Sequence, residues 1–411
     1  MEYSRNPQSL TASPAEPGEL PLRMRIGIIH RKDIRSVNSL SGSQYFMARS
    51  LQQHVGEIVH LGPDYTLHTQ ILAKSIQFTG RASLAVLRRR IANDHNPLLS
   101  RRYASVFSER LKSAQCDVLF APNASVEIAS LQTNIPIVYQ TDMNWFDIVN
   151  YYPGFSFAAR FAQRQGDKID SAAIHKARAV VYPSEWARNT AIQHYGASPA
   201  KVFRIPLGAN IEDDNIPVRE RALQHPLKGQ TSLLWLGVDW HRKGGPEALE
   251  CLRELRARGI DASLTVCGCT PPLGYSHPSM TVIPFLSKKS PRDRQRLSDL
   301  FLNSHFLLLP TRAEAFGIVF AEASAHGLPS IARDTGGVAG AVFHGKNGYL
   351  IPPEADGRAY ASTILEIVQN PDDYHRLVAS SRDTWEKQLN WDAWGRAMKN
   401  IFDAVVREKN S

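Results

Sequence analysis

The stretch LLLPTRAEAFGIVFAEASAHGLPSIARDTGG, residues 307–337, decides the fold of this chain. It opens with an apolar run that ends at Pro310, which predicts a buried strand. After a short polar loop the segment 316–326 predicts a helix, and Gly327 ends that helix. A strand that is followed closely by a helix is the unit from which parallel α/β sheets are built.

The first turn of this predicted helix is suited to binding an anion. Its leading N–H groups, on Phe316, Gly317 and Ile318, have no acceptor inside the helix, and the helix dipole adds positive charge there. Gly317 has no Cβ, so a bound group can approach the backbone closely. We therefore expect a phosphate or a diphosphate at this turn.

Two carboxylates flank the same turn. Glu314 stands just before the helix, and Glu322 follows eight residues later, a separation of roughly 12 Å or less at the rise of a helix. This is about the span from a sugar ring to a ribose across a diphosphate, so each carboxylate could accept hydrogen bonds from hydroxyls at one end of such a ligand. The alternative for Glu314 is stabilisation of the helix N-terminus. Glu322 interrupts an apolar helix, where an unpaired carboxylate is costly, and this favours a role in binding.

Apolar runs alternate with helical patterns along the chain from Met24 onward. The predicted strands include 25–30, 57–61, 116–122, 135–140, 177–184, 232–237, 262–268, 281–286 and 305–310. A polar stretch at 212–230 interrupts the alternation, so the chain divides into two α/β halves near residue 210. The final segment predicts an amphipathic helix with an apolar face made of Trp394, Met398, Ile401 and Phe402.

The bulk composition is that of a globular protein with two domains. The 411 residues are 43% hydrophobic and 21% charged, and no apolar run approaches the roughly 20 residues of a membrane span. The polar segment 1–23 lacks the apolar core of a signal peptide. The four cysteines fit no zinc site and indicate buried thiols. We expect a cytoplasmic protein without a metal site.

The net charge of +9 predicts an attraction to phosphate-bearing partners. Part of this charge is concentrated where arginines alternate with aliphatic residues, namely at Arg81, Arg88, Arg89, Arg90, Arg101 and Arg102. One basic amphipathic helix in this region would suit a peripheral contact with the acidic inner face of a membrane, and a solvated helix face is the alternative. Nucleic acid is not an expected partner, because no basic segment is interleaved with exposed aromatics as in the known binding modules.

The segment EAFGIVFAE, residues 314–322, resembles the Glu-x7-Glu motif of glycosyltransferase family 4, a group of retaining enzymes with the GT-B fold. Other segments resemble the family in the same order along the chain. They are SLSGSQYFMARSL at 39–51, ARAVVYPSEWARNTAI at 177–192, VFRIPLGAN at 202–210, WLGVDWHRKGG at 235–245 and KNGYLIPP at 346–353. The resemblance therefore covers nearly the whole chain from Met24.

The resemblance implies an α/β architecture of the GT-B type, in which two Rossmann-like domains face each other across a cleft. The implied segments are a flexible start at 1–23, an acceptor-binding domain at 24–209, a nucleotide-sugar-binding domain at 210–385 and a helix at 386–411 that crosses back to the first domain. The donor would be a UDP- or GDP-sugar, and the acceptor would be a saccharide or a glycolipid. No cofactor is implied beyond the donor itself.

Family positions carried onto this sequence give the expected donor site. Lys243 would contact the diphosphate, Glu314 the transferred sugar and Glu322 the ribose. The backbone at 316–318 would hold the diphosphate, and Gly42 would line the cleft from the N-terminal side.

Three positions depart from the family's pattern, and one of them, Gly340 where many members have a glutamate, is assigned no function. Val238 stands where many members have an arginine, and Arg242, which suits a diphosphate, is the expected substitute; a solvated loop charge is the alternative. The region YQTDMNWFD, residues 139–147, offers Asp142 where many members have a histidine that faces the sugar. A turn or N-cap role is the alternative for Asp142.

The resemblance implies a retaining hexosyltransferase of polysaccharide biosynthesis, with Asp142, Lys243 and Glu314 as the catalytic candidates. Lys243, Arg242 and the helix N-terminus would stabilise charge on the departing diphosphate, so no metal ion is required. A GT-B protein that binds a nucleotide sugar without catalysis is the main alternative. A dinucleotide-dependent oxidoreductase is disfavoured, because the first βα turn reads SLSGSQ rather than Gly-x-Gly-x-x-Gly.

Overall fold

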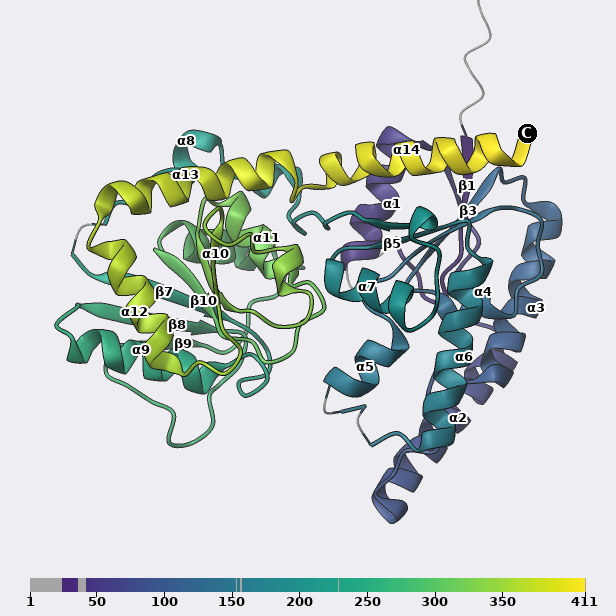
Figure 1. Cartoon of the computed structure of the whole chain (residues 1–411), viewed down its shortest axis with the longest axis horizontal. Coiled ribbons are helices and arrows are strands. Elements are labelled where there is room, and N and C mark those ends of the chain that lie inside the picture. Colours follow the sequence, from purple (N-terminus) through teal and green to yellow (C-terminus); the bar gives the residue numbers. More distant parts are fainter. Residues whose placement is uncertain (1–23, 36–41, 153, 156, 228, 411) are drawn as a thin grey trace, which may run out of the picture.

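The N-terminal half of the chain folds around a six-stranded parallel sheet (Figure 1). The computed structural model describes residues 24–35, 42–152, 154–155, 157–227 and 229–410. The strands of this half are β1 (Met24–Ile28), β2 (Gly56–His60), β3 (Val118–Pro122), β4 (Ile137–Gln140), β5 (Ala179–Tyr182) and β6 (Val202–Arg204). Their order across the sheet is β2-β1-β3-β4-β5-β6.

Helices cover both faces of this first sheet. Every residue of β3, β4 and β5 is buried, which is the expected state of central parallel strands packed on two sides. The helices are α1 (Ser43–His54), α2 (Leu67–Leu87), α3 (Pro97–Ser113), α4 (Ser125–Ala129), α5 (Trp145–Tyr151), α6 (Arg160–Lys176) and α7 (Glu185–Gln193), followed by the short 3₁₀ turn η2 (Pro199–Lys201). Ser184 caps α7 by accepting a hydrogen bond from the Ala187 N–H at 3.3 Å, as its position in the sequence predicts.

The C-terminal half has the same architecture, built on a second six-stranded parallel sheet. Its strands are β7 (Thr231–Leu236), β8 (Ala262–Cys267), β9 (Met280–Ile283), β10 (Phe306–Leu309), β11 (Ser330–Arg333) and β12 (Gly348–Ile351), in the order β12-β11-β10-β7-β8-β9. The other elements are η3 (Asp213–Asn215), α8 (Arg219–Ala222), α9 (Gly245–Ala257), α10 (Pro291–Leu302), α11 (Ile318–Ala325), η4 (Val338–Gly340), α12 (Gly357–Val368) and α13 (Pro371–Lys387). The expected division into two Rossmann-like halves is confirmed.

The chain crosses between the halves twice, and the two crossings lie against each other. The Ala209 N–H donates to the Leu389 carbonyl oxygen at 3.0 Å. A Cβ on Gly208 would lie 2.5 Å from the backbone nitrogen of Trp391, so this position needs glycine for the close approach. The outgoing and the returning segment therefore form one packed connection.

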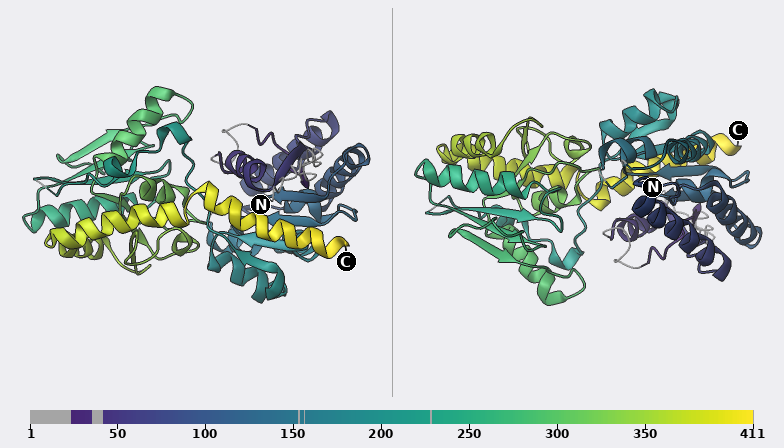
Figure 2. Two further views of the ribbon diagram at one scale, coloured as in Figure 1. Left: turned by 90° about the horizontal axis from the view of Figure 1, so that it is seen from above. Right: turned by 90° about the horizontal axis from the view of Figure 1, so that it is seen from below.

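The last helix, α14 (Trp391–Asn410), returns to the N-terminal half and packs on α1 and β3 (Figures 1 and 2). Its apolar face is the predicted one, because Trp394, Met398, Ile401 and Phe402 are all buried. The Trp394 ring lies 6.2 Å from the Phe120 ring of β3. Figure 2 shows α13 over the C-terminal half and α14 over the N-terminal half.

The expectation of one basic amphipathic helix through residues 81–102 is wrong. Helix α2 ends at Leu87, and Arg88 adopts a left-handed conformation with φ of 51° that no helix can continue. A new helix, α3, starts at Pro97, where the Asn96 side chain accepts from the Leu98 N–H at 2.9 Å. The arginines at 88–90 therefore lie in the turn between two helices. Across the described ranges, no helix is long and apolar enough to cross a bilayer.

We expect Trp394→Ala to lower the free energy of unfolding by about 3–5 kcal/mol, because it empties a buried site between α14 and β3. Arg396→Ala, on the exposed side of the same helix, should change it by no more than about 0.5 kcal/mol. Urea unfolding of both variants measures the difference. Similar values for the two would contradict the packing of α14 as part of the N-terminal core.

Candidate active site

The site is built on the start of α11, two residues later than the sequence predicts. Gly317 precedes the helix with φ of 86°, a left-handed conformation that excludes Phe316 from the helix. A Cβ on Gly317 would lie 2.5 Å from the Phe320 ring. Phe316 is instead a buried core residue.

The set of available amides shifts accordingly. The predicted set was Phe316, Gly317 and Ile318, and the structure places Gly317, Ile318 and Val319 at the helix start. None of these three N–H groups has an acceptor among the described residues, whereas the Phe320 N–H donates to the Gly317 carbonyl oxygen at 2.9 Å. The start of α11 thus offers unpaired donors at the positive end of the helix dipole.

Lys243 and Glu314 form an ion pair beside this helix start. Each side chain is only 13% exposed, so the pair is screened weakly by solvent. Glu314 is adjacent to Gly317, because a Cβ on Gly317 would lie 3.2 Å from Glu314 Cγ. Lys243 lies in the loop between β7 and α9, where the Trp235 indole N–H donates to its carbonyl oxygen at 3.1 Å. The ammonium, the carboxylate and the free amides are therefore grouped together.

Arg242 is held by the loop that carries Glu314. The Arg242 guanidinium donates to the Ala313 carbonyl oxygen at 2.9 Å, and the backbone N–H of Arg242 donates to Asp239 Oδ1 at 3.0 Å. The loop packs closely on the end of β10, since a Cβ on Gly244 would lie 2.0 Å from the Pro310 carbonyl oxygen. Arg242 is thus an ordered cation of the site rather than a solvated loop charge.

Asp142, from the N-terminal half, lies close enough to Glu314 to feel its charge. Burial, and secondly the negative charge of Glu314, raise the pKa of Asp142 to about 6. Its Oδ1 atom is buried and has no hydrogen-bond partner among the described residues. The N-cap alternative is wrong, because α5 is capped by Asn144, whose N–H donates to Asp147 Oδ2 at 3.0 Å.

Tyr151 joins the two halves at this point and was not predicted. Its hydroxyl oxygen accepts from the Glu314 N–H at 2.9 Å and lies 2.9 Å from Thr335 Oγ1. A Cβ on Gly336 would lie 2.4 Å from the same hydroxyl. The tyrosine comes from α5 and its partners from the C-terminal half, so only the tertiary fold brings them together. No local pattern in the sequence marks Tyr151 as a site residue.

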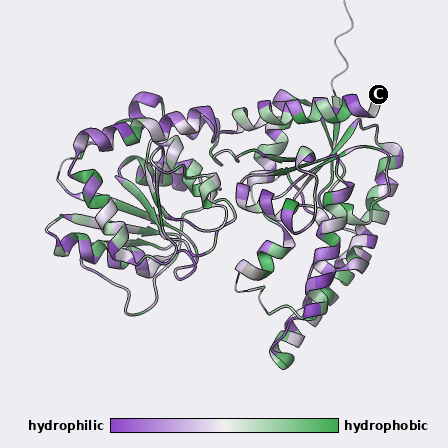
Figure 3. Cartoon of the chain, viewed as in Figure 1, coloured by the Kyte–Doolittle hydropathy of each residue, from purple (hydrophilic) through white to green (hydrophobic). Residues whose placement is uncertain are grey.

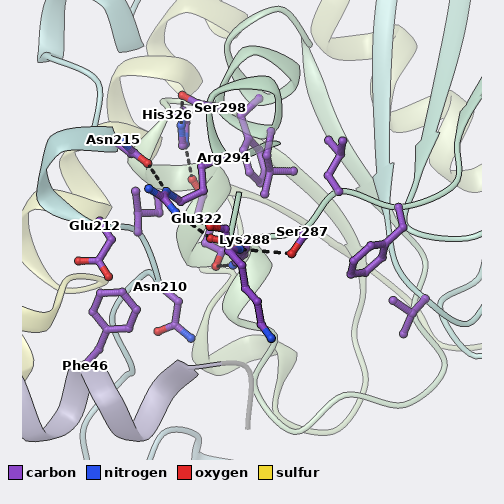
Figure 4. A pocket seen from close by; sticks show the side chains of 17 residues that line it. Phe46, Asn210, Glu212, Asn215, Ser287, Lys288, Arg294, Ser298, Glu322 and His326 are labelled. Atoms are coloured by element: carbon purple, nitrogen blue, oxygen red, sulfur yellow. Dashed lines mark hydrogen bonds and ion pairs between the residues drawn. The ribbon is translucent and has the colours of Figure 1, made fainter. Parts of the chain in front are cut away.

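Glu322 faces a cavity of about 760 Å³ between the C-terminal half and the connecting segment (Figure 4). The Glu322 side chain is buried and its carboxylate pairs with the Lys288 ammonium. The cavity is lined by Phe46, Asn210, Ile211, Glu212, Asn215, Val238, Phe285, Leu286, Ser287, Lys288, Lys289, Arg294, Leu297, Ser298, Phe301, Glu322 and His326. Lys288 was missed by the sequence reading, although it lies in the polar loop that follows β9.

The two predicted carboxylates do not share this cavity. Glu314 and Lys243 are not among its lining residues, whereas Val238, from the same loop as Lys243, is one of them. The loop after β7 therefore carries one residue of the cavity wall, Val238, and one member of the ion pair, Lys243. Gly42 is not among the residues that line the cavity. It precedes α1 with φ of 86°, and Ser43 next to it accepts at 3.1 Å from the side chain of Asn210, which does line the cavity.

Two family models match the sequence of the chain. The model of Glycosyltransferase Family 4 matches residues 47–213, and the model of Glycosyl transferases group 1 matches residues 223–384. The chain belongs to the group 1, family 4 glycosyltransferases. The family resemblance seen in the sequence is confirmed by these matches.

This glycosyltransferase chain is 25% identical over 244 residues to the D-inositol 3-phosphate glycosyltransferase of Streptomyces scabiei, which covers 53% of this chain and 52% of the relative. It spans about half the length of the curated relatives that it matches. In three dimensions it is similar to sucrose-phosphate synthase from Thermosynechococcus elongatus, with a TM-score of 0.65, 17% identity and coverage of 94% of this chain and 100% of the other. Anabaena HepE in complex with UDP and glucose gives a TM-score of 0.59 at 16% identity and covers 93% of this chain and 100% of the other. These likenesses confirm the GT-B fold.

Because the pKa of Asp142 is raised, we expect a substitution that removes its charge to increase the free energy of unfolding. Because this pKa rises from 3.8 to about 6, the folded glycosyltransferase holds the proton more tightly than the unfolded chain, and stability falls as pH rises through that interval. We expect Asp142→Asn to raise the free energy of unfolding by on the order of 1 kcal/mol at about pH 8, with the gain fading toward about pH 4. Urea unfolding at both pH values measures this. The exposed Asp214→Asn serves as the control, and a gain for Asp142→Asn that does not depend on pH would contradict the assignment.

Proposed function

We propose that this chain is a retaining glycosyltransferase that moves a hexose from a UDP- or GDP-sugar to a saccharide or lipid-linked acceptor without a metal ion. The observation that carries the proposal is the group formed by the Lys243–Glu314 ion pair and the unpaired amides at the start of α11. A diphosphate is the ligand that such a group accommodates best, since it needs both N–H donors and a cation.

The diphosphate would lie on the amides of Gly317, Ile318 and Val319, with Lys243 beside it. An ammonium has three donors, so Lys243 can keep its bond to Glu314 and still contact a phosphate oxygen. Arg242 adds a second cation to the same loop. As the bond to the sugar breaks, negative charge grows on the diphosphate, and these fixed donors stabilise it most at that moment.

The nucleoside would occupy the cavity that contains Glu322. Phe285 and Leu286 supply apolar surface for a base, and the Glu322 carboxylate can accept hydrogen bonds from ribose hydroxyls. Lys288 neutralises Glu322 in the absence of a ligand. The sugar would then lie at the other end of the diphosphate, near Glu314 and Asp142.

The proposal includes retention of the anomeric configuration and independence of metal. Glu314 is engaged with Lys243, and a front-face substitution requires no carboxylate to act as a covalent nucleophile. Asp142 would orient sugar or acceptor hydroxyls. Lys243, Arg242 and the amides supply the positive charge that a divalent ion would otherwise provide.

Loss of the Lys243 charge should remove most of the activity. We expect Lys243→Met to lower kcat by about 100- to 1000-fold, because one preorganised group that stabilises transition-state charge is worth this much. Lys346→Met, at an exposed position of the C-terminal half, should keep full turnover. Both proteins are assayed with and without EDTA, and the wild-type rate should not change with the chelator. A Lys243→Met rate within twofold of wild type, or a wild-type rate abolished by EDTA, would contradict the mechanism.

The donor can be found by thermal shift with UDP-, GDP- and ADP-sugars. A true donor binds only the folded state and raises the Tm in proportion to the logarithm of its concentration over Kd. Transfer from that donor, with the anomeric configuration of the product determined by NMR, then tests the reaction itself. No shift with any nucleotide sugar would refute the donor site. A shift without hydrolysis or transfer would favour the alternative of a binding protein that lacks catalysis.

A further inference from the structure

Helix α2 carries an apolar stripe that the fold leaves uncovered. Its buried face contains Thr69, Ile76, Gly80 and Ser83, while Leu67, Ile71 and Phe78 share another face at helical spacing and are all exposed. The Phe78 side chain is 74% exposed. Figure 3 shows hydrophobic and hydrophilic residues side by side along α2, which extends beyond the rest of the N-terminal half.

The stripe leads to an apolar cluster where α2 ends. Val86 is 80% exposed, and Leu87 is exposed beside it. The turn that follows is bound to the start of α6: the Arg90 N–H donates to the Phe157 carbonyl oxygen, and the Ala159 N–H to the Arg90 carbonyl oxygen, both at 2.8 Å. Phe157 and Phe161 are also exposed. We call Val86, Leu87, Phe157 and Phe161 the α2-end patch.

The segment that contains the α2 part of this patch has many basic residues and almost no carboxylates to neutralise them. Between Tyr65 and Arg102 the sequence contains seven lysines and arginines and a single carboxylate, Asp94. That carboxylate is directed at Arg31, 3.9 Å away. Arg81, Arg88 and Arg89 have no ion-pair partner among the described residues and remain exposed; they are available to an external anion.

We propose that the α2-end patch docks the protein onto an anionic membrane. Exposed phenylalanine and aliphatic side chains next to unpaired arginines have the composition of a surface that enters the headgroup region of acidic lipids, where apolar burial and charge attraction add. A folded protein partner would not require three exposed arginines without ion-pair partners, and a nucleic acid would gain nothing from the exposed aliphatic side chains of Val86 and Leu87.

The patch is joined by a short segment of chain to the wall of the candidate active site. Tyr151, whose hydroxyl oxygen accepts from the Glu314 N–H, precedes Phe157 by six residues. Docking at the patch would hold the cleft at the lipid surface, which fits an acceptor anchored in the membrane. This last step rests on the proposed function, whereas the membrane contact itself does not.

Vesicle co-sedimentation of the full-length chain tests the proposal. The probes are phosphatidylcholine vesicles with and without phosphatidylglycerol, at low and at high salt and with no nucleotide sugar. We expect binding only to the anionic vesicles and weaker binding at high salt. Arg81→Glu/Arg89→Glu should lower the partition coefficient by at least about tenfold, and Val86→Ser/Phe157→Ser should also lower it.

Matched variants control for charge and for apolar surface. Lys346→Glu/Arg407→Glu makes the same charge change at exposed positions elsewhere, and Val218→Ser/Leu273→Ser removes exposed apolar groups from the C-terminal half. Both should bind vesicles like the wild type. An unchanged Tm and an unchanged donor-induced thermal shift show that each patch variant is folded with an intact donor site.

Three results would overturn the proposal. They are failure of the wild type to bind anionic vesicles, equal binding by the Arg81→Glu/Arg89→Glu variant, and tighter binding to duplex DNA than to vesicles at the same salt concentration. Because the assay contains no donor, its failure leaves the transferase proposal standing, and a failed donor screen leaves this proposal standing.

Discussion

The unpaired amides at the start of α11 are the constraint on which the rest of the site depends. A helix must leave its first N–H groups without intrahelical partners, and here the left-handed Gly317 turns the chain sharply enough that no side chain caps them. A ligand that binds beside the Lys243–Glu314 pair would accept hydrogen bonds from these open donors. The loops after β7 and β10 hold both charges in place through contacts with Trp235 and Pro310.

The second half of the site depends on close contact between the two domains. Tyr151 reaches across from α5 and is met by the backbone of Glu314 and by Thr335. Glycine is required on the C-terminal side, because a Cβ on Gly336 would meet the tyrosine hydroxyl, and one on Gly340 would lie 2.7 Å from the Pro183 carbonyl oxygen. In this way the loop after β11 fits against the N-terminal half, and Asp142 is brought within electrostatic range of Glu314.

The sequence was sufficient for features that rest on periodicity and local chemistry. Alternating apolar runs predicted two parallel sheets, and the face of α14 was predicted from Trp394, Met398 and Phe402. The errors arose where one residue's backbone conformation decided the outcome: φ of 86° at Gly317 moved the helix start, and φ of 51° at Arg88 divided a predicted helix. Neither conformation can be read from a pattern of hydrophobicity. Tyr151 and Lys288 were missed because their partners are distant in sequence.

The paired crossings near Ala209 and Leu389 have a mechanical consequence. A single linker would let the two domains swing and twist in any direction, whereas two strands of chain that are hydrogen-bonded side by side resist both separation and torsion. We expect the domains to move by bending at this paired connection rather than by free rotation about a single linker. Any opening of the cleft would then follow the same path each time, and the carboxylate of Asp142 would return to the same place opposite Glu314 when it shuts.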